Sequence, residues 1–199
     1  MEYVCGEGAV VIRKLRDSEG DYALMLKWLS DPLVLDFYEG RSNPFDMGMI
    51  KAKFAPRARG ESRVVQCIIE HDSAAIGFVQ YYAIKRGEYC EAELLEMEDF
   101  KAPHGIDIVI GETGFWNRGV GTNVVKMLTA HLLESGNADI IFVDPQTRNR
   151  RAIRCYEKCG FVSVAVKEKR ELHDGEYQDS LIMCKTSADK PPRSKNKAV

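Results

Sequence analysis

Hydrophobic residues along this chain switch repeatedly between the two-residue period of strands and the three-to-four-residue period of helices. Helical spacing over Glu19–Leu29 ends at Asp31-Pro32, because a residue before proline avoids the helical region. Strand patterns on both sides of His71–Ser73 predict a hairpin. The elements expected in this half are strands at Val10–Leu15, Val64–Glu70 and Ala74–Ile84, helices at Glu19–Leu29 and Asp46–Arg57, and a short helical segment or loop at Leu33–Tyr38.

In the second half, strand and helix patterns alternate. The apolar run Ile106–Ile110 predicts a strand, and Val120, Val124 and Leu128 begin a helix over roughly 119–135. The other elements expected are strands at Asp139–Val143, Phe161–Glu168 and Gln178–Lys185 and a helix at Arg148–Cys159. This order favours an α+β or mixed α/β architecture with helices on both faces of one sheet.

Size and charge limit the possible classes of protein. A chain of 199 residues with 45% hydrophobic residues suits one domain, expected over residues 1–185, and needs no disulfide or metal to hold its core. Residues 186–199 are rich in Lys and Pro and are expected to be disordered. A formal net charge of −2 argues against nucleic acid as a partner.

The location is expected to be cytoplasmic. The first residues lack a basic segment followed by an apolar run, and no apolar run is long enough to cross a membrane. The six cysteines are scattered, which favours reduced thiols in the cytosol. Cys155 and Cys159 share a helix face, but a zinc site would need two more ligands nearby, so no metal is expected.

The glycine-rich stretch Arg118–Thr122 stands between a predicted strand and a predicted helix. Free N–H groups at a helix start bind phosphate oxygens, and glycine allows the ligand to approach the backbone. A dinucleotide-binding unit would need a third glycine where Val124 stands, and a P-loop would need Gly-Lys-Ser/Thr. The turn therefore predicts a different kind of phosphate-binding site.

A second motif follows the glycine turn: Asn149 near a helix start, Tyr156 two turns later, and Gly160-Phe161 at the end. Together the two motifs resemble the Gcn5-related N-acetyltransferase superfamily, over roughly residues 9–185. Three stretches resemble the aminoglycoside 6′-N-acetyltransferases more closely, namely Gly105–Asp107, Asp144-Pro145 and Arg151–Lys158. Trp116 departs from the Gln or Arg that is usual in the superfamily, although some of these closer relatives carry Trp there.

The resemblance implies a single-domain acetyltransferase fold with a central, mostly antiparallel, twisted sheet flanked by helices. It implies direct transfer of acetyl from acetyl-CoA to the 6′-amino group of an aminoglycoside antibiotic, a small polycationic substrate, as in antibiotic resistance. The enzyme would be a monomer or homodimer without metal. The alternatives are the same fold acting on a protein N-terminus, a polyamine or a small metabolite, and a non-catalytic acyl-CoA-binding module.

Asp107 is the lone acid of an apolar strand, in which it shares one face with Val109. A carboxylate there can hold a substrate ammonium and accept its proton, or it can be an ordinary aspartate on a solvated face. The resemblance makes Asp107 the general base. It also makes Tyr156 the acid that protonates the leaving sulfur, where the alternative is a packing aromatic.

The remaining expected contacts concern the two substrates. The resemblance implies that a pyrophosphate and a pantetheine arm contact Ile108, Val109, Ile110, Arg118, Gly119, Val120, Gly121, Thr122, Asn123, Asn149 and Ala152. The acidic segment Gly87–Asp99 suits a polycation, and its alternative is a solvated loop. The residues expected to bind the acceptor are Asp36, Tyr38, Glu96, Glu98, Asp144 and Asp174.

Overall fold

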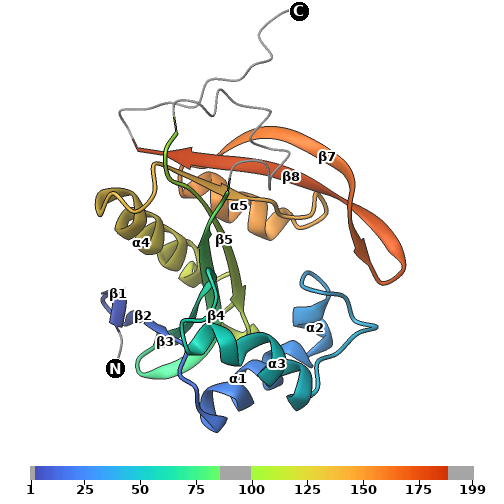
Figure 1. The fold of residues 1–199 in the computed structure, drawn as a ribbon. Helices are drawn as coiled ribbons and strands as arrows, with labels where there is room; N and C mark the ends of the chain where they lie inside the picture. Colours follow the sequence, from blue (N-terminus) through green and yellow to red (C-terminus); the bar gives the residue numbers. More distant parts are fainter. Residues whose placement is uncertain (1–2, 86–99, 188–199) are drawn as a thin grey trace, which may run out of the picture.

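A computed structural model describes residues 3–85 and 100–187 (Figure 1). Its strands form one eight-stranded sheet in the order β1-β2-β3-β4-β5-β6-β8-β7. β5 and β6 run parallel, and every other pair of neighbours is antiparallel. The strands are β1 (Tyr3–Glu7), β2 (Val10–Lys14), β3 (Val65–His71), β4 (Ala74–Ala83), β5 (Pro103–Ile110), β6 (Ile140–Val143), β7 (Val162–His173) and β8 (Glu176–Thr186).

Helices cover both faces of the sheet (Figure 1). Ile68 of β3 packs in the cluster that contains residues of α1 and α3, whereas Cys67 and Ile69 pack in the cluster of α4 and α5. No helix within the described ranges has the length and apolar character needed to cross a bilayer. The helices are α1 (Glu19–Leu29), α2 (Pro32–Leu35), α3 (Met47–Ala58), α4 (Val120–Glu134) and α5 (Arg150–Lys158), with a short 3₁₀ turn, η3, at Thr113–Phe115.

The mixed α/β, mostly antiparallel architecture expected from the sequence is confirmed. α1 has the expected bounds, because Ser18 accepts a hydrogen bond from the backbone N–H of Asp21 and Leu29 is followed by Asp31-Pro32. β1 was not expected, since it is largely exposed and pairs only with β2.

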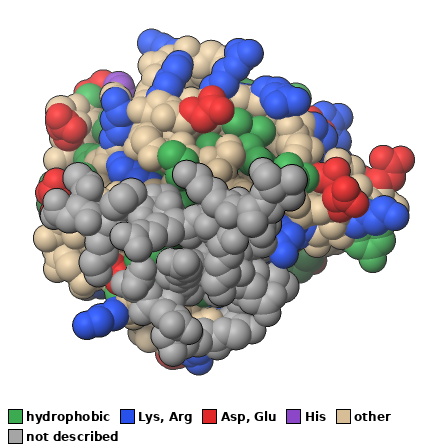
Figure 2. Space-filling model, turned by 90° about the horizontal axis from the view of Figure 1, so that it is seen from above, with side chains coloured by type: hydrophobic (Ala, Val, Ile, Leu, Met, Phe, Trp, Pro, Cys, Tyr) green, Lys and Arg blue, Asp and Glu red, His purple; other side chains and the backbone are tan. Residues whose placement is uncertain are grey.

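β7 and β8 are longer than the expected strands because exposed charged residues extend their pairing beyond the apolar part. The sheet therefore ends in a long edge strand (Figure 1), whose exposed side chains include charged residues as well as Val162, Val166 and Leu172. Seen from the β7–β8 side of the molecule, Lys and Arg side chains are spread along the rim (Figure 2). Charges on an edge strand discourage pairing with other chains.

The sheet opens between β5 and β6. These strands pair only over Pro103–Gly105 and Ile140–Phe142, while β5 continues beside β4 as far as Ile110. β6 ends at Val143, and Pro145 then lacks the N–H that a further strand bond would need. From Ile106 onward the β6 side of β5 is therefore without a paired strand, and the sheet has a gap there.

A buried ion pair fixes α1 against the sheet. The Arg13 guanidinium of β2 donates to both carboxylate oxygens of Asp21, over 2.6 and 2.9 Å, and each residue is 4% exposed. Asp21 also accepts from the backbone N–H of Arg16, and Arg13 donates to Glu70 of β3. The pair is bidentate and hydrogen-bonded at every edge, which is the arrangement that a buried charge pair requires.

Asp21→Ala should lower the free energy of unfolding by about 3–5 kcal/mol, because it leaves a buried guanidinium without its main partner. Urea denaturation followed by circular dichroism measures this loss. The matched control is Glu19→Ala, on the same helix as Asp21. This change removes an exposed ion pair with Lys51 of α3 and should lower the free energy of unfolding far less. Equal losses for the two variants would contradict a special role for the buried pair.

Candidate active site

A cavity of about 520 Å³ lies where β5 and β6 separate. Its walls come from the end of β5, the segment around η3, the first turn of α4, the length of α5 and the α2 region. It is therefore lined by residues from both faces of the sheet, and the opening between the two strands connects them. The lining residues are Leu33, Val34, Phe37, Tyr38, Ile108, Val109, Ile110, Phe115, Trp116, Asn117, Gly119, Gly121, Thr122, Asn149, Arg150, Arg151, Ala152, Arg154, Cys155, Tyr156 and Lys158.

The start of α4 offers backbone donors to this cavity. Gly119 caps the helix in the left-handed conformation, with φ of 81°, and no side chain accepts a hydrogen bond from the first turn. A Cβ at Gly119 would meet no atom within 4 Å, so the turn requires glycine for its backbone conformation. Free N–H groups and the helix dipole suit an anionic group here.

The predicted cofactor-contacting residues divide into two groups. Val120 is buried in the core, and Arg118 and Asn123 are exposed; none of these three lines the cavity. Asn149 lines it and also caps α5, because its Oδ1 accepts from the backbone N–H of Ala152 over 3.1 Å. The predicted residues that the structure gathers around the cavity are Ile108, Val109, Ile110, Gly119, Gly121, Thr122, Asn149 and Ala152.

An aromatic and arginine rim borders the cavity. The Trp116 Nε1–H donates to the carbonyl of Ile110 over 2.7 Å, and the Arg151 guanidinium lies 3.7 Å from the Trp116 ring centroid. Arg148 lies 4.8 Å from the Phe37 ring. Burial lowers the pKa of Arg151. In the sequence, Trp116 was noted because it stands where the superfamily usually has Gln or Arg. No sequence pattern indicated that Arg148 would contact Phe37.

Asp107 projects from β5 toward α3, on the face that it shares with Val109. Val109 packs against the cluster of α1 and α3, whereas Ile106, Ile108 and Ile110 belong to the cluster of α4 and α5, so the expected alternation is confirmed. Asp107 does not itself line the cavity, although its neighbours Ile108 and Val109 do. It therefore approaches the site from the α3 side of the opening.

The environment of Asp107 makes its carboxyl a weaker acid. Burial raises the pKa of Asp107 to about 6, and the negative charge of Asp144 acts in the same direction. A hydrogen bond from Gln80 and the charges of Arg57 and Lys53 oppose this rise. The Gln80 Nε2–H donates to Asp107 Oδ2 over 2.6 Å. A carboxyl with such a pKa can accept a proton near neutral pH.

Tyr156 lies on α5, on the opposite side of the opening. It lines the cavity, is 6% exposed and packs with its ring centroid 5.5 Å from that of Phe161. Burial raises the pKa of Tyr156 well above its ordinary value, and the charge of Asp107 contributes to the rise. The phenol therefore keeps its proton and can donate it in a hydrogen bond.

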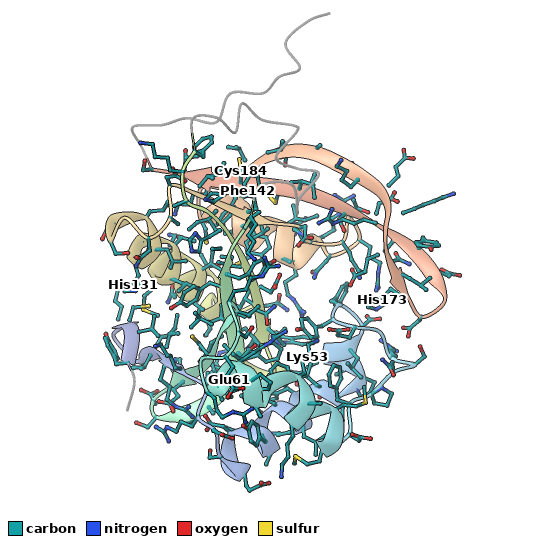
Figure 3. All side chains as sticks on the ribbon, viewed as in Figure 1. Lys53, Glu61, His131, Phe142, His173 and Cys184 are labelled. Carbon is teal, nitrogen blue, oxygen red and sulfur yellow. The ribbon has the colours of Figure 1, made fainter. Side chains whose placement is uncertain are left out.

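The residues predicted to bind an acceptor are mostly engaged with their own chain. Asp36 pairs with Arg41 over 3.2 Å, and Asp144 pairs with Arg170 over 3.2 Å. Asp174 accepts from the hydroxyl and backbone N–H of Ser42 and from the Arg41 N–H, which lower its pKa to about 2. These bonds join the β7–β8 hairpin, where Figure 3 labels His173, to the loop after α2.

Among the four predicted acceptor contacts that lie in the described part of the chain, Tyr38 alone lines the cavity. Its ring meets Phe78 edge-on at 5.5 Å, and burial raises its pKa. Glu96 and Glu98, with the rest of the acidic segment, lie outside the described residues.

A pair of thiols stands beside the glycine turn. The Cys155 Sγ lies 3.5 Å from the Thr122 hydroxyl, and the Cys159 Sγ lies 3.5 Å from the Thr122 carbonyl oxygen. Hydrogen bonds from Cys159 and Thr122 lower the pKa of Cys155, whereas burial raises the pKa of Cys184 to about 12. Within residues 3–85 and 100–187, no group of three or more His, Cys, Asp or Glu residues is placed to hold a metal ion.

Comparison with known proteins finds similar sequences and similar folds. A family model described as an acetyltransferase (GNAT) domain matches residues 17–168. The aminoglycoside N(6′)-acetyltransferase type 1 of Klebsiella pneumoniae is 28% identical over 145 residues, which cover 72% of this chain and 70% of that protein.

Solved structures share the fold. A crystal structure of the aminoglycoside acetyltransferase AAC(6′)-Ib in complex with coenzyme A has a TM-score of 0.71 at 23% identity, covering 89% of this chain and 95% of that one. The spermidine N-acetyltransferase from Vibrio cholerae, in complex with coenzyme A and spermine, also has a TM-score of 0.71, at 15% identity, covering 90% and 96%.

Iodoacetamide near neutral pH should modify Cys155 roughly tenfold faster than Cys184, because the thiolate is the nucleophile and Cys155 also borders the cavity. Peptide mass spectrometry after timed quenching measures the two rates in one sample. Thr122→Val removes the hydroxyl beside Cys155 and should slow its modification. Faster labelling of Cys184 would show that the cavity does not expose Cys155.

Proposed function

We propose that this chain, which belongs to the acetyltransferase (GNAT) domain family, transfers the acetyl group of acetyl-CoA directly to the 6′-amino group of an aminoglycoside. The observation that carries this proposal is the placement of Asp107 and Tyr156 on opposite sides of the β5–β6 opening. One is a carboxyl with a pKa near neutrality, and the other is a phenol that retains its proton. Acyl transfer to an ammonium needs both kinds of group.

The cavity supplies the contacts that a coenzyme A thioester needs. The free N–H groups at the start of α4 suit the diphosphate, and the exposed edge of β5 from Ile108 to Ile110 can pair with the amides of the pantetheine arm. Arg151, Arg154 and Lys158 line the same cavity and add positive charge for phosphate groups. These features support the assignment of acetyl-CoA as the cosubstrate.

The proposed reaction uses each side of the opening in turn. Asp107 takes a proton from the acceptor ammonium, directly or through a water, and the amine nitrogen then forms a bond to the thioester carbonyl carbon. A backbone N–H on the unpaired side of β5 stabilises the charge that develops on the carbonyl oxygen. The carbon–sulfur bond breaks, and Tyr156 gives its proton to the departing thiolate. The second nitrogen proton, which the new amide must lose, passes to the Tyr156 phenolate and restores the phenol.

The choice of acceptor rests on similarity and on charge. The Klebsiella protein that shares 28% identity bears the name of an aminoglycoside N(6′)-acetyltransferase. In this chain, Asp36 and Asp144 already face arginines, so the ammonium groups of an aminoglycoside would replace arginine contacts at these carboxylates. Such an exchange keeps each carboxylate paired and suits a ligand with several cationic groups.

A polyamine is the second candidate acceptor. The spermidine N-acetyltransferase of the same fold supports it, and a linear polycation presents the same ammonium chemistry as an aminoglycoside. The two acceptors differ in shape, since an aminoglycoside is ringed and rigid. A direct assay therefore separates them.

Steady-state release of coenzyme A should be fast with aminoglycosides that carry a 6′-amino group and absent with otherwise matched aminoglycosides that carry a 6′-hydroxyl. Spermidine and spermine form the third arm of the assay, and mass spectrometry of the product identifies the acetylated nitrogen. Activity with polyamines alone would replace the aminoglycoside by the second candidate. Binding of acetyl-CoA without turnover of any amine would contradict the enzymatic proposal.

Asp107→Asn should lower kcat by roughly 10²–10⁴-fold, the usual contribution of a general base, and should leave coenzyme A binding intact. In the unmodified enzyme, kcat/KM should fall as pH decreases through about 6, because protonation of Asp107 removes the base. The acidic limb should disappear from the residual activity of the variant. Tyr38→Phe is the control, since it alters a cavity residue without removing the base, and it should retain this limb.

A further inference from the structure

A chain of polar side chains leads from α3 to Asp107. The Arg57 Nη1–H donates to Gln80 Oε1 over 2.6 Å, and Gln80 Nε2–H donates to Asp107 Oδ2 over 2.6 Å. Arg57 also donates to Gln66 Oε1 over 3.0 Å. Gln80 stands directly opposite Asp107 in the β4–β5 register, and it is 8% exposed. Three elements, α3, β4 and β5, therefore meet in one partly buried chain of hydrogen bonds.

The orientation of the Gln80 amide follows from its two neighbours. A guanidinium can only donate, so it faces the amide oxygen, and an ionised carboxylate can only accept, so it faces the amide nitrogen. The reverse orientation would place donor against donor and acceptor against acceptor. Arg57 thereby dictates that Gln80 offers an N–H to Asp107.

Gln66 contacts Arg57 through its amide oxygen, and this orientation has an unfavourable consequence for its amide nitrogen. Gln66 is 2% exposed, and its Nε2 is buried without a hydrogen-bond partner among the described residues. A buried amide N–H without a partner is unfavourable. Turning this amide would point its N–H groups at the Arg57 donors, so the Arg57 contact holds the oxygen in place.

We infer that Gln80 and Arg57 are positioning residues that orient the Asp107 carboxylate for proton transfer and hold it in its ionised form. This inference rests on the proposed role of Asp107 as the base. We call the hydrogen bonds from Arg57 to Gln80 and from Gln80 to Asp107 the relay. The relay contacts Asp107 at Oδ2 and does not involve Oδ1. A base fixed through one oxygen can present the other to the acceptor in a constant direction.

Other charged and titratable groups also face Asp107. Asp144 approaches from the end of β6, Lys53 from α3, Tyr38 from the segment after α2 and Tyr156 from α5. Figure 3 labels Lys53 on the same helix as Arg57. Lys53 acts on Asp107 through its charge, whereas Arg57 acts through both its charge and the Gln80 bond. The relay is therefore tested by comparing these two basic residues.

The test variant is Gln80→Met, which keeps the length of the side chain and removes both amide groups. Loss of the N–H donor should move the acidic limb of kcat/KM to higher pH by about one unit, since a hydrogen bond to a charged group is worth about that much. Arg57→Met should move the limb in the same direction, and Arg57→Lys should recover part of the change. Gln80→Glu should move it further, because it adds a like charge beside Asp107.

Arg59→Met is the matched control for Arg57→Met. Arg59 caps the same helix, but it pairs with Glu61 and Asp17 and is exposed, so its removal should leave the acidic limb in place. Lys53→Met separates charge from hydrogen bonding and should give a smaller shift than Arg57→Met. Thermal melting of each variant verifies that the fold is retained.

Titration of the Asp107 carboxyl by NMR gives a readout that needs no turnover. A higher pKa in Gln80→Met and Arg57→Met than in the unmodified protein supports the relay even if every amine tested proves inert. An unchanged pKa, or an acidic limb that does not move while the unmodified enzyme acetylates normally, would overturn the relay and leave the proposed function standing.

Discussion

The early separation of β5 from β6 is the constraint on which the site depends. Backbone pairing stops after Gly105, and the sheet that would otherwise be continuous becomes two walls. A closed sheet would isolate the α3 face from the α5 face, because side chains of a strand project to one face or the other. The gap lets groups on opposite faces act on one reacting centre. It also leaves backbone donors on β5 free for a ligand.

The glycine turn before α4 also leaves backbone N–H groups free. α4 begins at a glycine with a left-handed backbone and no side-chain cap, so its first N–H groups remain free beside the unpaired edge of β5. Both features expose backbone groups that a stable fold would normally satisfy. These two features therefore place free main-chain donors side by side, where an anionic and amide-rich ligand can use them.

Local sequence patterns predicted the parts of this arrangement that depend on periodicity. Alternation in β5 separated Asp107 from the isoleucines, and the glycine turn marked the start of α4. The helix step explains why Val120 and Asn123 miss the cavity although they stand beside residues that line it. A contiguous motif cannot all face one ligand once it enters a helix.

Contacts between distant segments could not be predicted from one sequence. Asp174 looked like a free acid for substrate binding, but its carboxylate is bonded to Ser42, far away along the chain. The Gln80 and Arg57 relay and the Trp116–Arg151 stack depend equally on tertiary pairing. Nothing in the local pattern distinguishes Gln80 from other buried glutamines or Arg57 from other arginines.

The relay answers a chemical problem that direct pairing would not solve. An arginine in contact with Asp107 would depress its pKa by about 1–3 units and make it a poor base. Burial alone would raise the pKa and leave the carboxyl protonated near neutral pH, with no fixed orientation. The neutral amide of Gln80 stands between Arg57 and Asp107. Arg57 fixes the orientation of this amide, which in turn orients Asp107, while the positive charge stays farther from the carboxylate. Asp36 and Asp144, by contrast, contact arginines directly, so each of these carboxylates already holds a cation.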